Sequence, residues 1–367
     1  MNLTCRMVSI PFQSAFSHHR ATRAVSESFW VEASYLGQLG IGEGCPRSYV
    51  TGETPESCEA FFERIAPLAS TCIDDLPALQ TFRKEHHDDI LLNPSAWCAM
   101  ELAMLDLLAR IQGQSVEVYL GWPVLQGPFH YSGVLGSDVG GVFEGKLKAH
   151  VDLGFQDFKL KWGRDPVFNQ SRFDALKGLV PNAKVRIDAN NCWKHVQEAI
   201  KDLAGWDVSR KSQPAIWAIE EPLVSIQFED LLEFSILLDC QVILDEAVCN
   251  VDQLLPFLEH PDRFLLNLRI SKCGGLLQAA EIAATCMDAG MGVIVGAQVG
   301  ETSVLTRAAL SIAEMLGKHC VAQEGAYGTY LLSEDMTRST LMFGPKGQLH
   351  IADLGLQDGL GLALKQT

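Results

Sequence analysis

The sequence predicts an α/β fold whose main body is a barrel of parallel strands, preceded by a non-repetitive α+β region. Two observations favour this class. After Pro123, short apolar runs alternate with amphipathic stretches, as in a parallel sheet that closes on itself. In addition, an ionisable residue ends each of five successive apolar runs, at intervals of 25 to 32 residues, which is the length of a strand, a helix and two loops. The five residues are Lys161, Asp188, Glu220, Asp245 and Lys272.

The first third of the chain combines strand and helix signals. TCRMVSIPF and SFWVEASYL are strand-like runs, and we interpret the glycines at 37, 40, 42 and 44 as turn residues after them. A helix is predicted over 54–70, where Thr54 precedes a proline at the first helical position. Another is predicted over 95–112, where apolar residues recur at helical spacing. Residues 1–122 are therefore expected to form an α+β domain.

The repeating region predicts eight strands separated by helices. The strands are expected at 130–136, 157–163, 184–190, 215–222, 241–247, 263–272, 292–298 and 319–324, and helices at 194–204, 226–238 and 276–289. The pattern breaks beyond 325. We therefore expect the barrel to span 123–330, and residues 331–367 to return to the N-terminal domain.

The bulk composition excludes some classes of partner. A net charge of −16 argues against nucleic acid and anionic membranes. No apolar run approaches the length of a membrane span, and the first residues lack the organisation of a signal peptide. The eleven cysteines have no regular spacing, so reduced thiols are expected rather than zinc ligands or a disulfide framework. The cytoplasm is the expected location.

The five charged residues indicate metal-assisted acid/base chemistry. The carboxyl ends of parallel barrel strands meet on one face, so the three acids are expected to bind Mg²⁺ together. Lys159 and Lys161 leave the same face of one strand, and crowding of the two ammonium groups is expected to lower their pKa values. An amine beside a hard cation can remove a proton α to a carboxylate and give an enediolate. The alternative is that these side chains are solvated or salt-bridged.

Several motifs resemble the enolase superfamily, specifically its muconate-lactonizing-enzyme subgroup. They are KLK at 159–161, DAN at 188–190, EEP at 220–222, DE at 245–246 and SKCGG at 271–275, with further likeness at 40–53 and 100–121. The resemblance covers nearly the whole chain. It implies a modified TIM barrel, (β/α)7β, capped by an α+β domain that the C-terminal segment completes. The superfamily uses a lysine or histidine base with one or two Mg²⁺ ions.

The resemblance also implies a role for each motif residue. Lys161 and Lys272 would be the acid/base pair, and Lys159 would contact the substrate carboxylate and tune Lys161. Asp188 and two further acids would bind Mg²⁺, and neighbouring polar residues would support them without binding the metal. The further ligands are Glu220 and Asp245, and the supporting residues are Asn190, Glu221 and Glu246.

Substrate contacts are expected from the last barrel strands and from two N-terminal loops. Glu301 resembles a glutamate at the end of the seventh strand in relatives, and Glu324 could hold one cationic nitrogen. Dipeptide epimerases carry an acidic DxD pair near that position, and Glu324 is the only acid here, which weakens the dipeptide reading. The loop candidates are His19, Arg23, Tyr49 and Thr51.

These residues leave more than one reaction open. The first choice is racemisation or epimerisation of an N-substituted amino acid or small amino-acid derivative, which needs both lysines. The alternatives are cycloisomerisation of the muconate-lactonizing type and syn-elimination of the succinylbenzoate-synthase type, which need one base. A catalytically silent barrel that serves as a binding module is the non-enzymatic alternative. The expected partner is a small-molecule carboxylate, and relatives suggest a homo-oligomer.

Overall fold

Eight parallel strands form the centre of the structure, a computed structural model that describes residues 1–18, 21–136, 140–208, 215–351 and 358–365. In the sheet each strand pairs with its sequence neighbour, in the order β12-β11-β10-β9-β8-β7-β6-β5. The bounds are β5 (Gly133–Leu135), β6 (Asp157–Lys161), β7 (Lys184–Asp188), β8 (Ala218–Glu220), β9 (Gln241–Leu244), β10 (Phe264–Leu268), β11 (Gly292–Val295) and β12 (Cys320–Gln323). All eight fall within predicted strands.

The two edges of this sheet meet. The amide of Ser132, just before β5, donates to the carbonyl of Gln323 at the end of β12, with an N–O distance of 2.8 Å. The eight strands therefore surround a common axis, and strands four places apart, such as β6 and β10, lie on opposite sides of it. Residues at the carboxyl ends of all strands then face one shared site.

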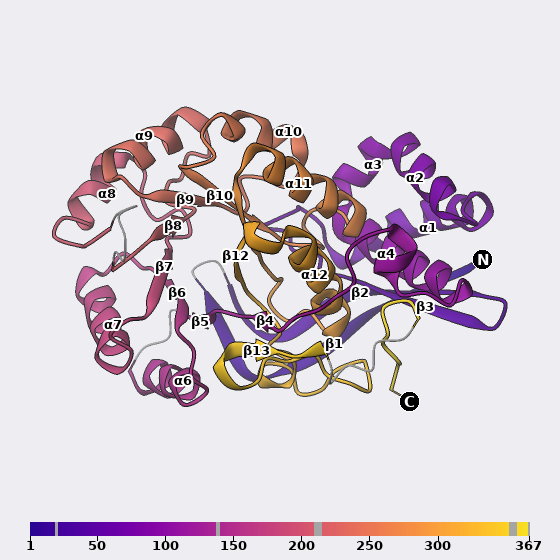
Figure 1. The fold of residues 1–367 in the computed structure, drawn as a ribbon, viewed down its shortest axis with the longest axis horizontal. Coiled ribbons are helices and arrows are strands. Elements are labelled where there is room, and N and C mark those ends of the chain that lie inside the picture. The colour runs from indigo at the N-terminus through magenta and orange to yellow at the C-terminus, as the bar shows by residue number, and fades with distance from the viewer. Residues whose placement is uncertain (19–20, 137–139, 209–214, 352–357, 366–367) are drawn as a thin grey trace.

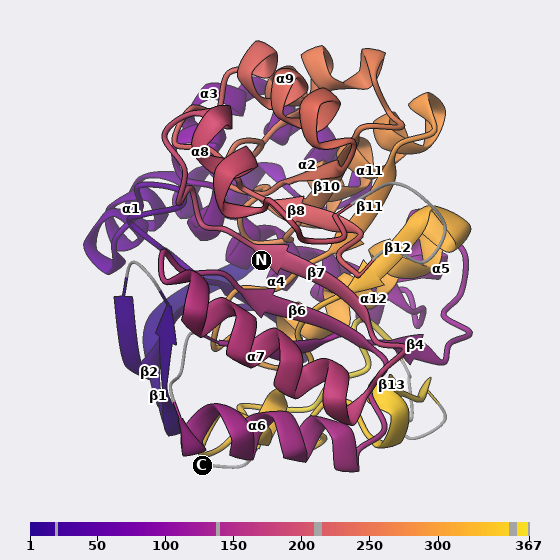
Figure 2. The same cartoon turned by 90° about the vertical axis from the view of Figure 1, so that its left-hand side faces the viewer.

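Helices cover the outside of the barrel between consecutive strands (Figures 1 and 2). They are α6 (Gly141–Asp152), α7 (Pro166–Leu179), α8 (Val196–Asp202), α9 (Phe228–Leu238), α10 (Val251–Leu254), α11 (Leu276–Ala289) and α12 (Ser303–Leu316). Local caps fix where several begin. Asp165 accepts hydrogen bonds from the first turn of α7, which opens with Pro166, and Thr302 caps α12 in the same way.

An α+β cap lies beside the barrel. Three antiparallel strands, β1 (Asn2–His18), β2 (Ala21–Tyr35) and β3 (Gln38–Gly44), form its sheet. Its helices are α1 (Pro55–Cys72), α2 (Leu76–Glu85), α3 (His87–Leu92), α4 (Pro94–Ile111) and α5 (Val116–Leu120). The helices α1 and α4 match the predicted ranges 54–70 and 95–112 closely. Because α4 is buried along nearly its whole length, it forms the centre of the cap.

The glycines at 40, 42 and 44 are not turn residues, and that prediction is wrong. All three lie within β3, and only Gly37 occupies a turn, with φ of +77°. A Cβ on Gly42 would lie 1.9 Å from the carbonyl oxygen of Ala99 in α4, and one on Gly44 would lie 1.9 Å from that of Ser95. The alternating glycines therefore let β3 approach the backbone of α4, which a turn signal in the sequence does not distinguish.

The predicted strand over 263–272 is also shorter than expected. β10 ends at Leu268, and the next residues turn back, since the amide of Cys273 donates to the carbonyl of Arg269 at 3.0 Å. The apolar Ile270 within the run had suggested a longer strand. The strand therefore ends at Leu268, and Arg269 instead of Lys272 is the charged residue that directly follows it.

The C-terminal segment contacts both the cap and the barrel. The amide of Gly359 donates to the carbonyl of Gln114 beside α5, and the Leu360 amide donates to Asp106 in α4. Earlier in the segment, β13 (Gln348–Leu349) pairs with β4 (Phe129–His130), which precedes the first barrel strand. No helix in the described part of the chain is both long and apolar enough to cross a bilayer.

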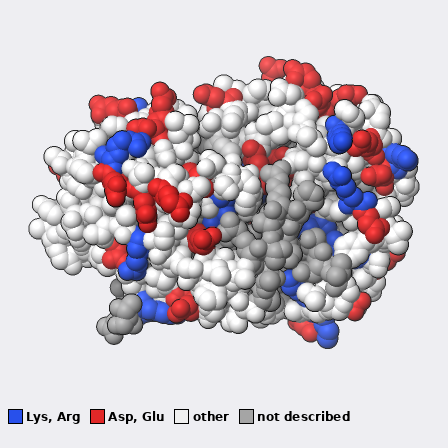
Figure 3. All heavy atoms as spheres, turned by 180° about the vertical axis from the view of Figure 1, so that it is seen from behind, with Lys and Arg blue, Asp and Glu red and all other residues white. Residues whose placement is uncertain are grey.

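Charges on the visible surface are mixed in sign. On the described part of the face in Figure 3, Lys and Arg side chains are interspersed with Asp and Glu and form no continuous basic area. The net charge of −16 agrees with this view.

Candidate active site

Three buried carboxylates lie at the carboxyl ends of consecutive strands. Asp188 and Glu220 are the last residues of β7 and β8, and Asp245 directly follows β9. Each is about 1% exposed. The side-chain amide of Asn267, in β10, donates to Glu220 at 3.1 Å and to Asp245 at 3.4 Å. The strands therefore bring the three predicted metal ligands into one buried region.

Lys159 lies among these acids. Its Nζ is 2.8 Å from Glu220 Oε1, 3.2 Å from Asp188 Oδ2 and 3.1 Å from Glu324 Oε2. Burial alone would lower the pKa of Lys159, but the three carboxylates outweigh burial and raise it well above its usual range. The prediction that ammonium crowding lowers this pKa is therefore wrong, because opposite charges surround the amine.

Lys161 lies at the edge of the same cluster. Its Nζ is 2.5 Å from Asp188 Oδ2 and 3.2 Å from Asn190 Oδ1. Although burial opposes it, Lys161 and Lys159 hold the pKa of Asp188 below its ordinary value. The Lys161 side chain is 14% exposed and lines the pocket, so it is both held by the acids and open to a small molecule.

Lys272 has a different environment. Its side chain is fully buried, and its Nζ lies 2.5, 2.9 and 3.0 Å from the carbonyl oxygens of Asp245, Val248 and Asn267. It also contacts Asp245 Oδ1 at 3.1 Å. These acceptors use all three ammonium protons, and Lys272 is absent from the described lining of the pocket. The structure thus places Lys272 next to a predicted ligand but away from the cavity.

Arg269 is the basic residue that the sequence reasoning missed. It directly follows β10, lines the pocket, and pairs with Asp245. Its guanidinium also lies 3.7 Å from Glu246 and donates to Gln298 at 3.2 Å. The sequence does hold a signal for Arg269. This residue directly follows the run LLNL, just as Asp245 directly follows the run VIL.

Polar residues after the strands support the acids. Asn190 donates its amide to Asp188 at 3.1 Å, and Glu221 accepts the amides of Asp245 and Ala247 at 2.6 and 3.0 Å. Both Asn190 and Glu221 adopt positive φ, near +45° and +42°. Such backbone strain is common at functional sites. Burial and the nearby Glu246 raise the pKa of Glu221 to about 8.

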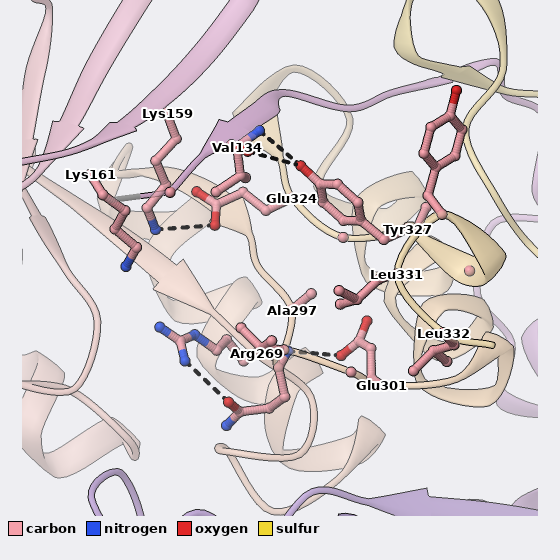
Figure 4. A pocket seen from close by; sticks show the side chains of 18 of the residues that line it. Val134, Lys159, Lys161, Arg269, Ala297, Glu301, Glu324, Tyr327, Leu331 and Leu332 are labelled. Carbon is pink, nitrogen blue, oxygen red and sulfur yellow. Dashed lines mark hydrogen bonds and ion pairs between the residues drawn. The ribbon is translucent and has the colours of Figure 1, made fainter. Parts of the chain in front are cut away.

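One pocket opens onto these groups (Figure 4). Lys159, Lys161 and Arg269 line one part of it together with Asn190, Glu246 and Glu324. The rest of the wall is largely apolar and aromatic, and comes from Tyr49, Val134, Ala297, Val299, Ala326, Tyr327, Tyr330, Leu331 and Leu332. The arrangement suits a molecule with an anionic end and an apolar arm.

The residues predicted to contact substrate have mixed placements. Tyr49, Glu301 and Glu324 line the pocket. Thr51 instead donates its hydroxyl to Glu53 at 2.7 Å and is outside the described lining. Arg23 lies in β2, where it pairs with Phe16 through the backbone. His19 lies outside the described residues.

Two of the pocket acids have contrasting charge states. Although burial opposes it, Lys159 and Arg186 lower the pKa of Glu324 to about 2. Arg186 donates to Glu324 at 2.8 Å from β7. Burial raises the pKa of Glu301 to about 8, so this acid is mostly protonated at neutral pH.

The carboxylates fit a hard divalent cation by their chemistry. Asp188, Glu220 and Asp245 are buried, and Glu220 Oε2 makes no hydrogen bond within the described protein although Lys159 Nζ lies 2.7 Å away. Burial raises the pKa of Glu220, which means that the anion lacks full compensation. Among the described residues, no three acidic, histidine or cysteine side chains form a ready ligand cluster. Lys159 contacts Asp188 and Glu220, and Arg269 pairs with Asp245.

Comparisons with known proteins find relatives that match most of the chain. A hydrophobic dipeptide epimerase of Enterococcus faecalis is 28% identical over 291 residues, which are 76% of each chain. Among solved structures, a dipeptide epimerase from Enterococcus faecalis V583, complexed with Mg and the dipeptide L-Leu-L-Tyr, has a TM-score of 0.81 and 22% identity, covering 98% of both chains. Muconate lactonizing enzyme from Pseudomonas fluorescens has a TM-score of 0.84 and 22% identity, covering 99% of this chain and 96% of that one.

These structural likenesses establish the modified TIM barrel with its cap as the fold. In addition, the family model described as "Enolase C-terminal domain-like" matches residues 144–367, which include the barrel strands from β6 to β12. The resemblance to the enolase superfamily and its muconate-lactonizing-enzyme subgroup is thereby confirmed, and the chain belongs to the enolase C-terminal domain-like family.

Proposed function

We propose that the chain is a Mg²⁺-dependent isomerase that removes the proton α to a carboxylate in a small-molecule substrate, with Lys161 as the base. The observation that carries the proposal is the position of Lys161. It is an amine on the pocket wall, 14% exposed, and it adjoins a group of buried carboxylates at consecutive strand ends. A base and a cation site in one cavity are the parts that carbon-acid chemistry requires.

The carboxylates would hold the ion. Asp188, Glu220 and Asp245 offer oxygen ligands of the kind that Mg²⁺ prefers. When bound, Mg²⁺ would offset the negative charge that develops on the substrate carboxylate. Lys159, which contacts Asp188 and Glu220, adds fixed positive charge on the same side of the pocket.

The pocket favours a substrate without a free ammonium group. Glu324 is already paired with Lys159 and Arg186, and the raised pKa of Glu301 leaves that acid mostly neutral. Glu324, the acid predicted to hold a cationic nitrogen, is therefore poorly suited to it, and Glu301 offers little negative charge in its place. An N-substituted amino acid or a related carboxylate with an apolar arm fits the wall better than a dipeptide with a free amine.

The outcome of the reaction depends on the group that faces the other side of the α carbon. The sequence assigned that place to Lys272 and so favoured racemisation or epimerisation. Because Lys272 is buried outside the pocket, the two-lysine form of that reaction lacks its second amine. The one-base alternatives, cycloisomerisation and syn-elimination, need only Lys161.

Hydrogen exchange tests the proposal. The protein would be incubated with Mg²⁺ in D₂O and a panel of N-acylated amino acids, dipeptides and lactone acids, and loss of the α proton followed by NMR. At least one compound should exchange, and Lys161→Met should slow that exchange by about 100-fold or more. Lys201→Met, a charge-matched change on the exposed side of α8, should exchange at the unaltered rate.

Two results would count against the proposal. One is exchange at the same rate in Lys161→Met. The other is a complete lack of exchange across the panel, which is what a silent binding barrel would give.

A further inference from the structure

Of the two basic residues after β10, Arg269 reaches the pocket and Lys272, which the sequence pattern placed there, does not. Lys272 is fully buried and saturated with acceptors, whereas the Arg269 side chain is 13% exposed and lines the pocket. Lys161 has nearly the same exposure, 14%. The amine of Lys161 at the end of β6 and the guanidinium of Arg269 after β10 are thus both exposed to the pocket.

The barrel topology sets these two groups opposite each other. β6 and β10 are four places apart among eight strands whose edges meet. Lys161 ends β6 and Arg269 directly follows β10, so they reach the pocket from opposing walls. Figure 4 shows both side chains extending from separate strands with their charged ends toward the same part of the cavity. A substrate held between them has one face toward each.

Its contacts place Arg269 at the reacting end of the pocket, whose lining it shares with Lys159 and Glu324. It also pairs with Asp245 and lies 3.7 Å from Glu246. A substrate carboxylate near the acids would therefore meet this guanidinium.

A guanidinium and an amine differ in what they can do there. Arginine stays protonated at any ordinary pH, so it holds negative charge but does not accept a proton. Lysine, when neutral, accepts a proton through its lone pair. In the proposed step the α C–H bond breaks, its electron pair stays on the substrate, and the proton forms an N–H bond on Lys161. Arg269 itself cannot take up a proton on its side of the pocket.

We propose that Arg269 faces the substrate opposite Lys161 and holds its charge without exchanging protons, so that proton transfer is confined to one face. This inference rests on the proposed function and specifies its stereochemistry. The proton then returns from Lys161 to the same face. Alternatively, the electron pair forms a double bond while a group on the neighbouring carbon departs with its own bonding pair and takes the proton from Lys161. The substrate class is a chiral carboxylate processed from one enantiomer.

Isotope exchange with separated enantiomers tests the one-sided site. Each enantiomer of N-acylated amino acids would be incubated in D₂O with Mg²⁺ and the unaltered protein. One enantiomer should exchange at least about 100-fold faster than the other. Arg269→Lys supplies an amine on the second face and should narrow that difference about 10-fold or more. Arg269→Met should leave exchange confined to the same enantiomer. Comparable exchange of both enantiomers by the unaltered protein would overturn the proposal.

A matched control lies on the same strand. Arg263 immediately precedes β10 at its other end and donates to the carbonyl of Ser235 at 3.0 Å. Arg263→Lys should keep the enantiomer difference of the unaltered protein. If Arg263→Lys narrowed the difference as Arg269→Lys does, the effect would not belong to the pocket, and the assignment of Arg269 would fail.

Chemical labelling tests the placement without any substrate. Phenylglyoxal would modify accessible arginines and reductive methylation accessible lysines, with the modified peptides read by mass. Arg269 and Lys161 should react in the folded protein, and Lys272 should react only after unfolding in urea. Modification of Lys272 at the rate of Lys161 would overturn the inference. A protein that exchanges neither enantiomer would contradict the proposed function, and labelling would still decide which group faces the pocket.

Discussion

Burial decides the role of Lys272 among the charged residues. The ammonium group lies between the loop after β9 and the end of β10, and it ties three backbone carbonyls and the Asp245 carboxylate together. A buried charge of this kind is tolerated only because its partners replace water. Its contribution is therefore to the geometry of the strand ends.

This role predicts a stability effect. Lys272→Met removes the ammonium donor from three buried carbonyls and from the Asp245 carboxylate, so the free energy of unfolding should fall by about 3–5 kcal/mol. Urea denaturation measures the loss. Lys201→Met on α8 should change the free energy of unfolding by less than about 0.5 kcal/mol. Equal free energies of unfolding for Lys272→Met and Lys201→Met would contradict a structural role for Lys272.

Residue-level prediction from sequence succeeded where strand ends were well marked. Lys161, Asp188 and Glu220 each close an apolar run and are the last residues of β6, β7 and β8. The prediction of the strand end failed after β10, because Ile270 continues the apolar pattern where the backbone already turns. A hydrophobic pattern records which side chains are apolar and not where the backbone leaves the sheet. Contacts between distant residues, such as Arg186 with Glu324, leave no local pattern at all.

At the scale of elements, the contact of β3 with α4 fixes the cap. One face of β3 has no side chains at Gly40, Gly42 and Gly44, and this face packs on the backbone of α4. A Cβ at these positions would lie 1.9 to 2.2 Å from main-chain atoms. Main-chain atoms cannot rotate away as a side chain can. The sequence located the helix correctly but could not reveal that these glycines serve packing, since both turns and close contacts select glycine.

This contact predicts a severe effect of one methyl group. Gly42→Ala should push β3 off α4 and lower the free energy of unfolding by about 3 kcal/mol or more. As a control, Gly178→Ala adds a methyl in α7 where nothing lies within 4 Å, and it should raise the free energy of unfolding by about 1 kcal/mol. Thermal melts distinguish the two directions. A neutral Gly42→Ala would contradict the packing described.

At the scale of the whole molecule, a buried ion pair joins the cap to the barrel. Arg307 in α12 donates to both oxygens of Glu117 in α5, at 2.7 and 2.9 Å, and Ser311 donates to the same carboxylate. Burial alone would raise the pKa of Glu117, but the bonds from Arg307 and Ser311 outweigh it and lower the pKa below the ordinary value of 4.5. The cap and the barrel are therefore joined by the Glu117 carboxylate, which loses its charge when it is protonated at low pH.

The sign of the pH effect follows from that shift. A group whose pKa is lower in the folded state adds stability above its unfolded value and loses it as the pH falls below that value. Glu117→Gln should be about 3 kcal/mol less stable than the unaltered protein at neutral pH, and the difference should shrink below pH 4.5. The difference in melting temperature between the two proteins, measured from about pH 3 to about pH 7, follows this loss of stability, because that range brackets the ordinary pKa of glutamate. A difference that stays constant with pH would contradict it.

A shared cation site at the carboxyl ends of β7, β8 and β9 is central to the proposed chemistry. Anomalous diffraction from a crystal soaked in Mn²⁺, which takes the same oxygen ligands as Mg²⁺, tests this most directly. The expected result is one strong peak bounded by Asp188, Glu220 and Asp245 beside Lys161, and its loss in Glu220→Gln. A peak elsewhere, or none in the pocket, would contradict the account.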